Sequence, residues 1–283
     1  MNTRRIDKIL DSRPTSDGDG VKIRRTLGLH RHDLDPFLMI DEIRADEAAD
    51  YVGGFPPHPH RGIETFTLMF EGGFEHRDHL GHQEALRDGG AQWMSTGRGV
   101  IHSEMPLTQE GRLHGFQLWV NLPAAQKMKA PEYAQAEAAA LPVRELPGGV
   151  RAKVFGGRWQ LAGEEVASPL DRLAAGARVL ELRLPAAGEL RLPTPADESV
   201  LVYVIDGALP GEQPVQAGQT AIYGAGEELG LRAGPAGARL LVLAGRPLGE
   251  PIAHYGPFVM NTEEEIRQAI ADYRNGTLAQ PAA

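Results

Sequence analysis

The sequence predicts an all-β protein made of two related modules and closed by a single helix. Short runs of β-branched and aromatic residues recur along the chain, and glycine and proline separate them. The 283 residues include 34 glycines and 21 prolines, which implies many turns. Many short strands at this density are typical of sandwiches and barrels.

The predicted strands show near-alternation of apolar and polar residues or a short apolar run, which is the pattern of a strand with one or two buried faces. The clearest of them are residues 64–70, 115–120, 178–184, 200–205 and 238–243. A stretch rich in Ala, Glu and Pro, residues 123–147, predicts a linker with room for a short helix.

One helix is predicted near the end of the chain. Thr262 and Glu265 have the spacing of a capping box, in which each side chain binds the backbone of the other residue. Ile266, Ala269, Ile270 and Tyr273 then form an apolar stripe at helical spacing, and Asn275-Gly276 is a stop signal.

A weak internal repeat relates the two halves of the chain. Residues 66–72 and residues 201–207 are both strands that end in an acidic residue and a glycine. Each is followed by a glycine-rich turn, at residues 97–99 and 224–226. The second copy carries Leu229-Gly-Leu231 about where the first carries His102-Ser-Glu104, so we expect only the first module to bind metal.

Composition excludes several kinds of chemistry. The chain has no cysteine, which rules out disulfides, thiolate metal sites, iron–sulfur clusters and a cysteine nucleophile. Its formal net charge of -9 argues against direct binding to nucleic acid. We also expect no membrane span and no signal peptide, and therefore a cytoplasmic protein.

The strongest chemical signal is a pair of metal-ligand patterns in the first module. Nine of the ten histidines lie at or before His114, and two of them form His58-Pro-His60. Some forty residues later comes His102-Ser-Glu104. Residues i and i+2 of a strand point to one face, so two such strands can present three imidazoles and one carboxylate to one ion. These donors suit iron, manganese, nickel or copper, and zinc is also compatible with them.

The other histidines of the module receive a structural interpretation. His76, His79 and His82 lie in a polar hairpin between two predicted strands. Three histidines on one loop can bind metal, but a solvated turn is the more ordinary state, and we predict that state here.

The motifs resemble those of a known family. Phe55-Pro-Pro-His-Pro-His-Arg-Gly-Ile-Glu-Thr65, residues 92–106, residues 116–122 and residues 249–270 are similar to the pirin family of the cupin superfamily. The resemblance runs from about Asp35 to Tyr273. It implies a bicupin fold, that is, two tandem cupin barrels of jelly-roll type, followed by the C-terminal helix. We therefore expect an N-terminal metal-binding domain at residues 1–135 and a metal-free domain at residues 136–283 that includes the helix.

The resemblance also implies the ligand set. The family's pattern falls on His58, His60, His102 and Glu104 without departure, with one divalent transition metal in the first barrel. Fe(II) is the first expectation, and Mn, Ni, Cu and Zn are alternatives. Glu64 has the same strand parity as His58 and His60, and other cupins use an acid at this spacing as a ligand. The resemblance favours Glu104, which leaves Glu64 as a partner of the ligands or a residue of the pocket.

The function implied by the resemblance is that of a dioxygenase. Similar pirins cleave flavonols such as quercetin with dioxygen, so the expected partners are a small aromatic substrate and dioxygen. Glu104 is then the expected catalytic base as well as a ligand. Other pirins resemble regulators, so the alternative is a metal- or redox-sensing protein that binds a transcription factor or a metabolic enzyme.

Overall fold

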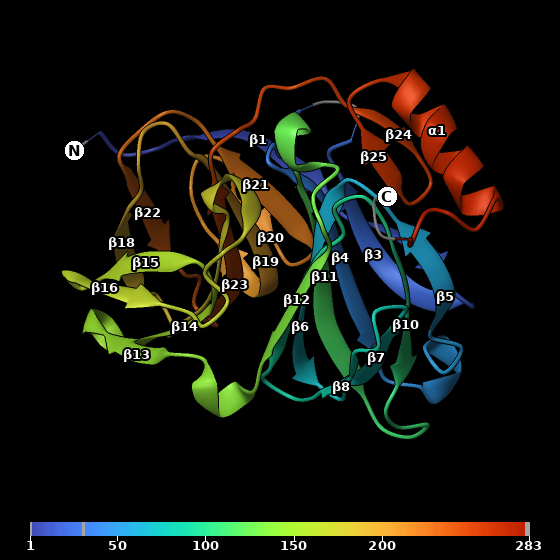
Figure 1. Cartoon of the computed structure of the whole chain (residues 1–283). Helices are drawn as coiled ribbons and strands as arrows, with labels where there is room; N and C mark the ends of the chain where they lie inside the picture. Colours follow the sequence, from blue (N-terminus) through green and yellow to red (C-terminus); the bar gives the residue numbers. More distant parts are fainter. Residues whose placement is uncertain (1, 30–31, 281–283) are drawn as a thin grey trace. The chain divides into compact units, whose positions relative to one another are not determined.

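The structure, a computed structural model, describes residues 2–29 and 32–280 and is mostly β, as predicted (Figure 1). The chain forms two compact units, and each combines segments that are distant in the sequence. One unit contains the histidines of the predicted metal site, and the other has Leu229 and Leu231 at the corresponding place, so we call them the histidine unit and the leucine unit. The histidine unit comprises residues 14–32, 37–138 and 248–283, and the leucine unit comprises residues 1–13, 33–36 and 139–247.

Among the described residues, the histidine unit contains two large sheets and a two-stranded one. In spatial order, the larger consists of β12 (Glu132–Ala136), β9 (Ala91–Ser95), β6 (Ile63–Glu71), β11 (Leu113–Asn121), β4 (Phe37–Ala45), β3 (Val21–Leu27) and β2 (Arg13–Asp17). The smaller consists of β5 (Phe55–His60), β10 (Val100–Pro106), β7 (Phe74–Asp78) and β8 (Gln83–Leu86). Apolar side chains from both sheets pack together in one core: Met69 and Leu113 of the larger sheet contact the cluster that includes Phe74 and Leu86 of the smaller.

The end of the chain completes the histidine unit. A hairpin of β24 (Ala253–Tyr255) and β25 (Phe258–Met260) precedes the helix α1 (Glu263–Arg274). Thr262 and Glu265 form both hydrogen bonds of the predicted capping box. Helix α1 lies beside β24 and β25 (Figure 1). Ile266 and Ala269 of α1 belong to one apolar cluster with Phe258 of β25. The predicted helix and its cap are therefore confirmed.

The leucine unit has one large sheet and two small ones. The large sheet runs β1 (Ile6–Asp11), β21 (Gln219–Tyr223), β19 (Ser199–Leu209), β23 (Ala238–Gly245), β17 (Arg178–Leu184), β14 (Val150–Gly156) and β13 (Val143–Leu146), with β20 (Val215–Gln216) beside β19. The small sheets pair β15 (Arg158–Leu161) with β16 (Glu164–Ala167) and β18 (Glu189–Pro193) with β22 (Glu228–Arg232). The five predicted strands all appear, as β6, β11, β17, β19 and β23; β17 has the predicted bounds, and the others are longer by up to five residues.

The two compact units exchange their terminal segments. Strand β1, near the start of the chain, pairs with β21 in the leucine unit. Helix α1, which the sequence assigns to the second domain, belongs to the histidine unit. The boundary between residues 135 and 136 stays a prediction. Each unit also includes a segment from the other side of that boundary: residues 1–13 belong to the leucine unit, and residues 248–283 belong to the histidine unit.

The stretch predicted as a linker contains strands rather than an α-helix. Within residues 123–147, β12 pairs with β9 and β13 pairs with β14. The helical turns in this stretch are the short 3-10 segments Ala124–Gln126 and Ala138–Ala140, and a third, Pro147–Gly149, starts at its end. The other 3-10 segments of the described residues are Ala48–Asp50 and Ala174–Gly176. Pairing with a sheet edge overrides the weak helical preference of Ala and Glu here.

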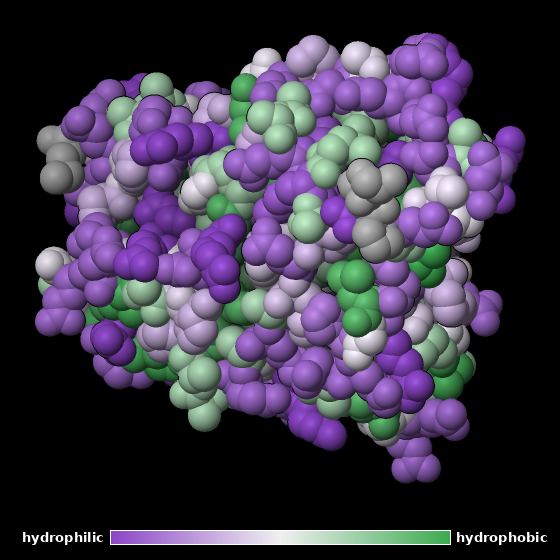
Figure 2. All heavy atoms as spheres, in the orientation of Figure 1, coloured by the Kyte–Doolittle hydropathy of each residue, from purple (hydrophilic) through white to green (hydrophobic). Residues whose placement is uncertain are grey.

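The surface is mainly polar on the face seen in Figure 2, where apolar residues are scattered among polar ones. The large apolar side chains that are exposed come from separate segments, such as Val52, Leu80 and Met128. Within the described residues, no helix has the length and the apolar character that a membrane span requires.

Candidate metal centre

Strands β5 and β10 carry the four residues predicted to bind metal. The strands pair antiparallel, with His58 opposite His102 and His60 opposite Val100. His58 and His60 are two residues apart on one strand, so they project from the same face. One ring nitrogen each of His58, His60 and His102 lies within 4.8 Å of the other two. The structure thus brings the three predicted imidazoles together.

Glu104 belongs to a second group of donor atoms, which shares His102 with the first. Donor atoms of Glu104, His102 and His76 lie within 4.8 Å of one another. His76 comes from β7, where it pairs directly with Glu104 across the strands. Glu104 therefore joins the predicted histidines through His102, and His76 is an additional member of the cluster.

Burial keeps two of the imidazoles neutral. His60 and His102 are each about 2% exposed. Burial and then the neighbouring His58 lower the pKa of His60 to about 3. Burial, followed by the effects of three neighbouring histidines, holds the pKa of His102 well below its ordinary value of 6.5. A neutral imidazole keeps a lone pair, so both rings are ready to bind a cation at neutral pH.

The hydrogen bonds of His58 and His60 fix which nitrogen each ring presents. Nδ1 of His58 lies 2.8 Å from the carbonyl oxygen of Pro56, and Nδ1 of His60 lies 3.3 Å from that of Pro257. Carbonyl oxygens only accept, so both Nδ1 atoms carry the proton. The Nε2 atoms of the two rings lie 3.1 Å apart, so both are placed to bind one cation.

His102 adds a second sign that the cluster fits a metal. Its Nε2 atom is buried and has no hydrogen-bond partner among the residues that the structure describes. A buried polar atom left without a partner costs about 1–3 kcal/mol. A metal ion would satisfy this nitrogen, so the residues present fit the predicted group.

Three neutral donors hold the carboxylate of Glu104, which is buried. The amide of Gln117 donates to Oε2 at 2.7 Å. The hydroxyl of Thr67 and the amide of Gln92 donate to Oε1, each at 3.3 Å. Both carboxylate oxygens are therefore fixed in orientation beside His102.

A pocket of about 680 Å³ opens beside the imidazoles. Its volume is within the range of small-molecule sites. Its walls combine two of the predicted ligands, apolar side chains and charged side chains. They include His58, His60, Gln117, Met39, Phe55, Pro57, Trp119, Arg25, Asp17 and Asp41. An organic molecule in this pocket would contact two of the four proposed ligands, His58 and His60.

Comparisons with known proteins agree with this site. Two family models match the chain, one described as Pirin over residues 20–120 and one as Pirin C-terminal cupin domain over residues 179–279. A Caulobacter vibrioides "Pirin-like protein" is 42% identical over 278 residues, which cover 98% of this chain and 99% of that protein.

The chain belongs to the pirin family.

Two further relatives carry the name of an enzyme. A Vibrio cholerae protein named "Putative quercetin 2,3-dioxygenase" is 48% identical over 275 residues, 96% of this chain and 97% of that protein. The crystal structure of a quercetin 2,3-dioxygenase from Acinetobacter baumannii superposes with a TM-score of 0.87 and 30% identity, covering 98% of each chain. The predicted bicupin fold of this pirin is thereby confirmed.

Glu64 lies apart from both groups of donor atoms in this pirin. It is fully buried on β6, in register with Ser95 of β9 and Val120 of β11. Neither three-residue donor group found among the described residues includes it. Its expected role as a partner of the ligands or a residue of the pocket stays a prediction.

His76 is the residue whose environment the sequence did not predict. The hairpin of β7 and β8 forms as expected, and His82 at its turn is partly exposed. His76, however, is completely buried, so the solvated state predicted for it is wrong. The available signal was the alternation His76-Arg-Asp78, which places two polar side chains on the inner face of one strand.

A buried lysine fixes the turn that follows the ligand strand β5. Gly62 adopts a φ of 84°, and a Cβ atom there would lie 2.0 Å from the carbonyl oxygen of Val259. The ammonium of Lys127 donates to the carbonyl oxygens of Gly62 (2.8 Å) and Val259 (3.0 Å) and to Oδ1 of Asn121 (2.7 Å). Burial lowers the pKa of Lys127 to about 8.

Helix α1 is tied to the same turn. The guanidinium of Arg61, which is almost fully buried, pairs with Asp272 of α1 at 2.7 Å. Arg61 directly follows His60, so the C-terminal segment holds both ends of this turn: Pro257 accepts from the His60 ring, and Asp272 binds Arg61. These contacts explain why the helix belongs to the histidine unit.

Proposed function

We propose that this pirin is a metal-dependent dioxygenase that cleaves flavonols such as quercetin. One divalent transition metal, Fe(II) in the first instance, would be held by His58, His60, His102 and Glu104. The observation that carries the proposal is that two imidazoles of the cluster, His58 and His60, line a pocket large enough for a flavonoid. The names of the relatives from Vibrio cholerae and Acinetobacter baumannii support the substrate class.

The pocket suits a flat, hydroxylated aromatic molecule. Met39, Phe55 and Trp119 give it apolar walls. Asp17 and Asp41 contribute carboxylates that hold Arg25 between them. Carboxylates accept hydrogen bonds from phenolic hydroxyl groups. The lining therefore offers apolar walls for the rings of a polyphenol and acceptors for its hydroxyl groups.

When bound, the metal would act as a Lewis acid and redox centre toward the hydroxy-ketone edge of the flavonol and dioxygen. The protein's own side chains would position the substrate and move the proton. Trp119 and Phe55 would hold the ring system against the imidazoles. A carboxylate oxygen of Glu104 would accept the proton of the substrate hydroxyl, while Gln117 keeps the other oxygen fixed.

Loading the protein with Fe(II), Mn(II), Ni(II) or Cu(II) and adding quercetin in air tests the proposal. We expect loss of the near-ultraviolet absorbance of quercetin, matched by oxygen uptake, and no turnover in His102→Ala. If every metal form binds its ion and leaves quercetin intact, the substrate assignment is wrong. The regulatory role that the sequence left open would then take its place.

A further inference from the structure

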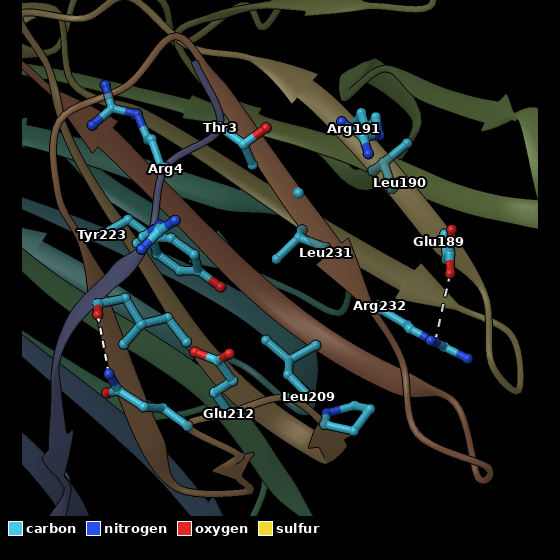
Figure 3. Close-up of a pocket in the computed structure, with 16 residues that line it drawn as sticks. Thr3, Arg4, Glu189, Leu190, Arg191, Leu209, Glu212, Tyr223, Leu231 and Arg232 are labelled. Atoms are coloured by element: carbon cyan, nitrogen blue, oxygen red, sulfur yellow. Dashed lines mark hydrogen bonds and ion pairs between the residues drawn. The ribbon is translucent and has the colours of Figure 1, made fainter. Parts of the chain in front are cut away.

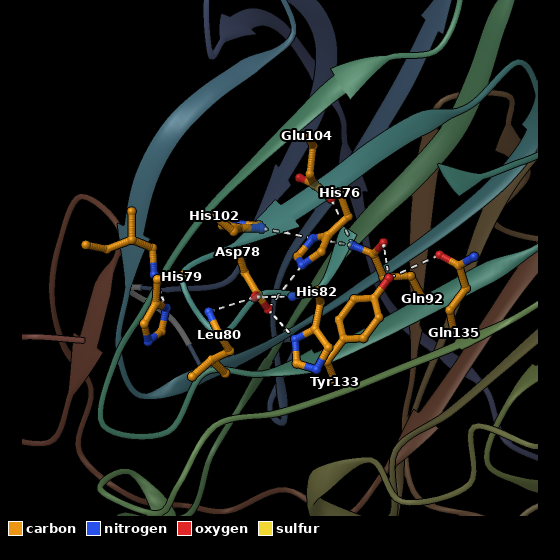
Figure 4. Close-up of polar contacts among 11 residues, drawn as sticks. His76, Asp78, His79, Leu80, His82, Gln92, His102, Glu104, Tyr133 and Gln135 are labelled. Carbon is orange, nitrogen blue, oxygen red and sulfur yellow. Dashed lines mark hydrogen bonds and ion pairs between the residues drawn. The ribbon is translucent and has the colours of Figure 1, made fainter. Parts of the chain in front are cut away.

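A chain of buried polar side chains leads from His102 to the turn between β7 and β8 (Figure 4). Strand β7 lies next to β10, and its Asp78 and His76 pair with His102 and Glu104 in register. A His-x-Asp pattern thus stands directly beside the His-x-Glu pattern of the proposed ligands. His76 is fully buried, and the side chain of Asp78 is about 1% exposed.

Asp78 lies at the far end of this series of polar contacts, and both oxygens of its carboxylate are hydrogen-bonded. Oδ1 of Asp78 accepts the backbone N–H groups of Leu80 (2.9 Å) and His82 (3.0 Å). Oδ2 lies 2.7 Å from Nδ1 of His82 and 3.4 Å from Nε2 of His76. A carboxylate only accepts hydrogen bonds, so Nε2 of His76 is the donor.

The direction of the remaining hydrogen bond follows. The amide nitrogen of Gln92 only donates and lies 3.3 Å from Nδ1 of His76, so this Nδ1 atom is an unprotonated acceptor, and it also faces Nδ1 of His102 at 3.5 Å. An acceptor at His76 requires the proton on Nδ1 of His102. That tautomer leaves Nε2 of His102 with its lone pair, and this is the buried atom that lacks a partner among the described residues.

Two neighbours hold His76 in place. The ring of Tyr133 stacks on His76 with 4.6 Å between ring centroids, and it also stacks on His82 at 4.9 Å. The hydroxyl of Tyr133 lies 3.2 Å from Oε1 of Gln92, and Nε2 of Gln92 lies 3.3 Å from Nδ1 of His76. Gln92 also donates to Glu104, so the same amide group contacts His76 and the proposed ligand Glu104.

We propose that His76 and Asp78 are positioning residues that set the tautomer and orientation of His102, so that its Nε2 atom faces the metal. This proposal rests on the metal site of the proposed function. It assigns His76 a role through Nδ1 of His102, on the opposite side of the ring from the proposed ligand atom. His76 is therefore a support of the metal site and not a fifth ligand.

The first experiment needs no metal. Nitrogen NMR of histidine-labelled protein, with the His102 signals assigned from His102→Gln, reports which ring nitrogen is protonated. We expect the Nδ1–H tautomer of His102 in the wild type and a shift toward the Nε2–H tautomer in His76→Leu. His76→Gln keeps a polar acceptor at this place and should restore much of the wild-type signal. An unchanged tautomer in His76→Leu would overturn the proposal.

The second experiment measures the dissociation constant for Ni(II) on the same proteins. Loss of a residue that orients a metal ligand costs about 10–100-fold in affinity. We expect this loss in His76→Leu and in Asp78→Asn, which keeps the size of the side chain and covers the case in which His76→Leu fails to fold. Arg77→Gln, on the exposed face of the same strand, is the matched control and should change affinity less than about twofold.

The outcomes separate this proposal from the proposed function. If the wild type binds no metal but the tautomer shifts in His76→Leu, the positioning role stands and the metal site fails. If His102→Ala abolishes binding while His76→Leu and Asp78→Asn bind as the wild type does, the positioning role fails alone. If Cu(II) spectra of the wild type show four nitrogen ligands, one more than the three proposed imidazoles supply, His76 is itself a ligand and the proposal is overturned.

Discussion

The histidine unit and the leucine unit follow the same strand order with different interiors. The order β12-β9-β6-β11-β4-β3-β2 in one corresponds position by position to β1-β21-β19-β23-β17-β14-β13 in the other. The pair β5–β10 likewise corresponds to β18–β22. Where β5 and β10 place His58 opposite His102, β18 and β22 place Leu192 opposite Leu229. The weak repeat in the sequence therefore reflects a repeated topology.

The interior of the leucine unit shows what this topology needs to fold. Its core is a continuous apolar cluster that includes Leu192, Leu229 and Leu231. A pocket of about 670 Å³ in this unit has charged and apolar walls with no histidine among its lining residues, where for example Arg232 pairs with Glu189 (Figure 3). Leucines satisfy the fold at these positions, so the buried histidines of the other unit carry a cost that the fold does not require. That difference points to chemistry as the reason for them.

Replacing a histidine by the residue of the other unit should give the largest effect. In His102→Leu, we expect affinity for divalent metal to fall by more than about 100-fold, because even outer partners of a ligand cost 10–100-fold. The metal-free protein should change little in stability, since the change removes a buried Nε2 atom that lacks a partner among the described residues, and the Nδ1 acceptor of His76 that loses His102 keeps Gln92 as a donor. Metal titration and thermal unfolding of the metal-free protein measure both. Metal binding as in the wild type would show that the two units do not differ in the way we describe.

A substitution at the corresponding position of the leucine unit should affect stability alone. Leu229 is fully buried, so Leu229→Ala should lower the free energy of unfolding by about 3 kcal/mol, as expected for a cavity in an apolar core. Chemical denaturation gives this value, and elemental analysis should show the metal content unchanged. A loss of metal on this substitution would mean that the two interiors are not independent.

Lys127 supports the ligand strand, and the effect of its loss should depend on pH. Lys127→Met leaves three buried oxygens without this donor and should cost about 2 kcal/mol at pH 7. Burial lowers the pKa of Lys127 from 10.5 to about 8. The unfolded chain therefore binds more protons between pH 8 and 10.5, and the wild type gains stability across that window.

The variant lacks this gain. The difference in unfolding free energy between the wild type and Lys127→Met should therefore widen from pH 8 to 10.5, by up to about 3 kcal/mol. Denaturation at several pH values measures the difference directly. A difference that narrows as the pH rises would contradict the assigned direction of the pKa shift.

The smallest effect is expected for Tyr133→Phe. The ring keeps its stacking on His76 and His82, and the single hydroxyl proton, which is shared between Gln92 and Gln135, is lost. One hydrogen bond is worth about 1 kcal/mol, so stability should fall by no more than that and metal affinity by a few fold. A loss as large as that of His76→Leu would show that the hydroxyl, and not the stacked ring, holds the site.

Much of this site could be predicted from local patterns. The alternation in His58-Pro-His60 and His102-Ser-Glu104 fixes which side chains share a face, because the period of a strand is two. The cap of α1 follows from Thr262 and Glu265 for the same kind of local reason. These features depend on residues within a few positions of one another.

The features that escaped prediction depend on pairing between distant strands. His76 lies in a polar hairpin that resembles a solvated turn, and it is buried because β7 pairs with β10. The Ala- and Glu-rich segment around β12 becomes a strand because β9 offers it an edge. The exchange of β1 and α1 between the units follows in the same way from contacts that no local pattern encodes.

The metal content of the protein, measured by elemental analysis alongside His102→Leu, tests the central claim most directly. The histidine unit holds the predicted ligands and the leucine unit has leucines at the corresponding strand pair, so we predict one transition-metal ion per wild-type chain. We predict none in His102→Leu after the same preparation, and one in Leu229→Ala. Two ions per chain, or an ion retained in His102→Leu, would contradict the account.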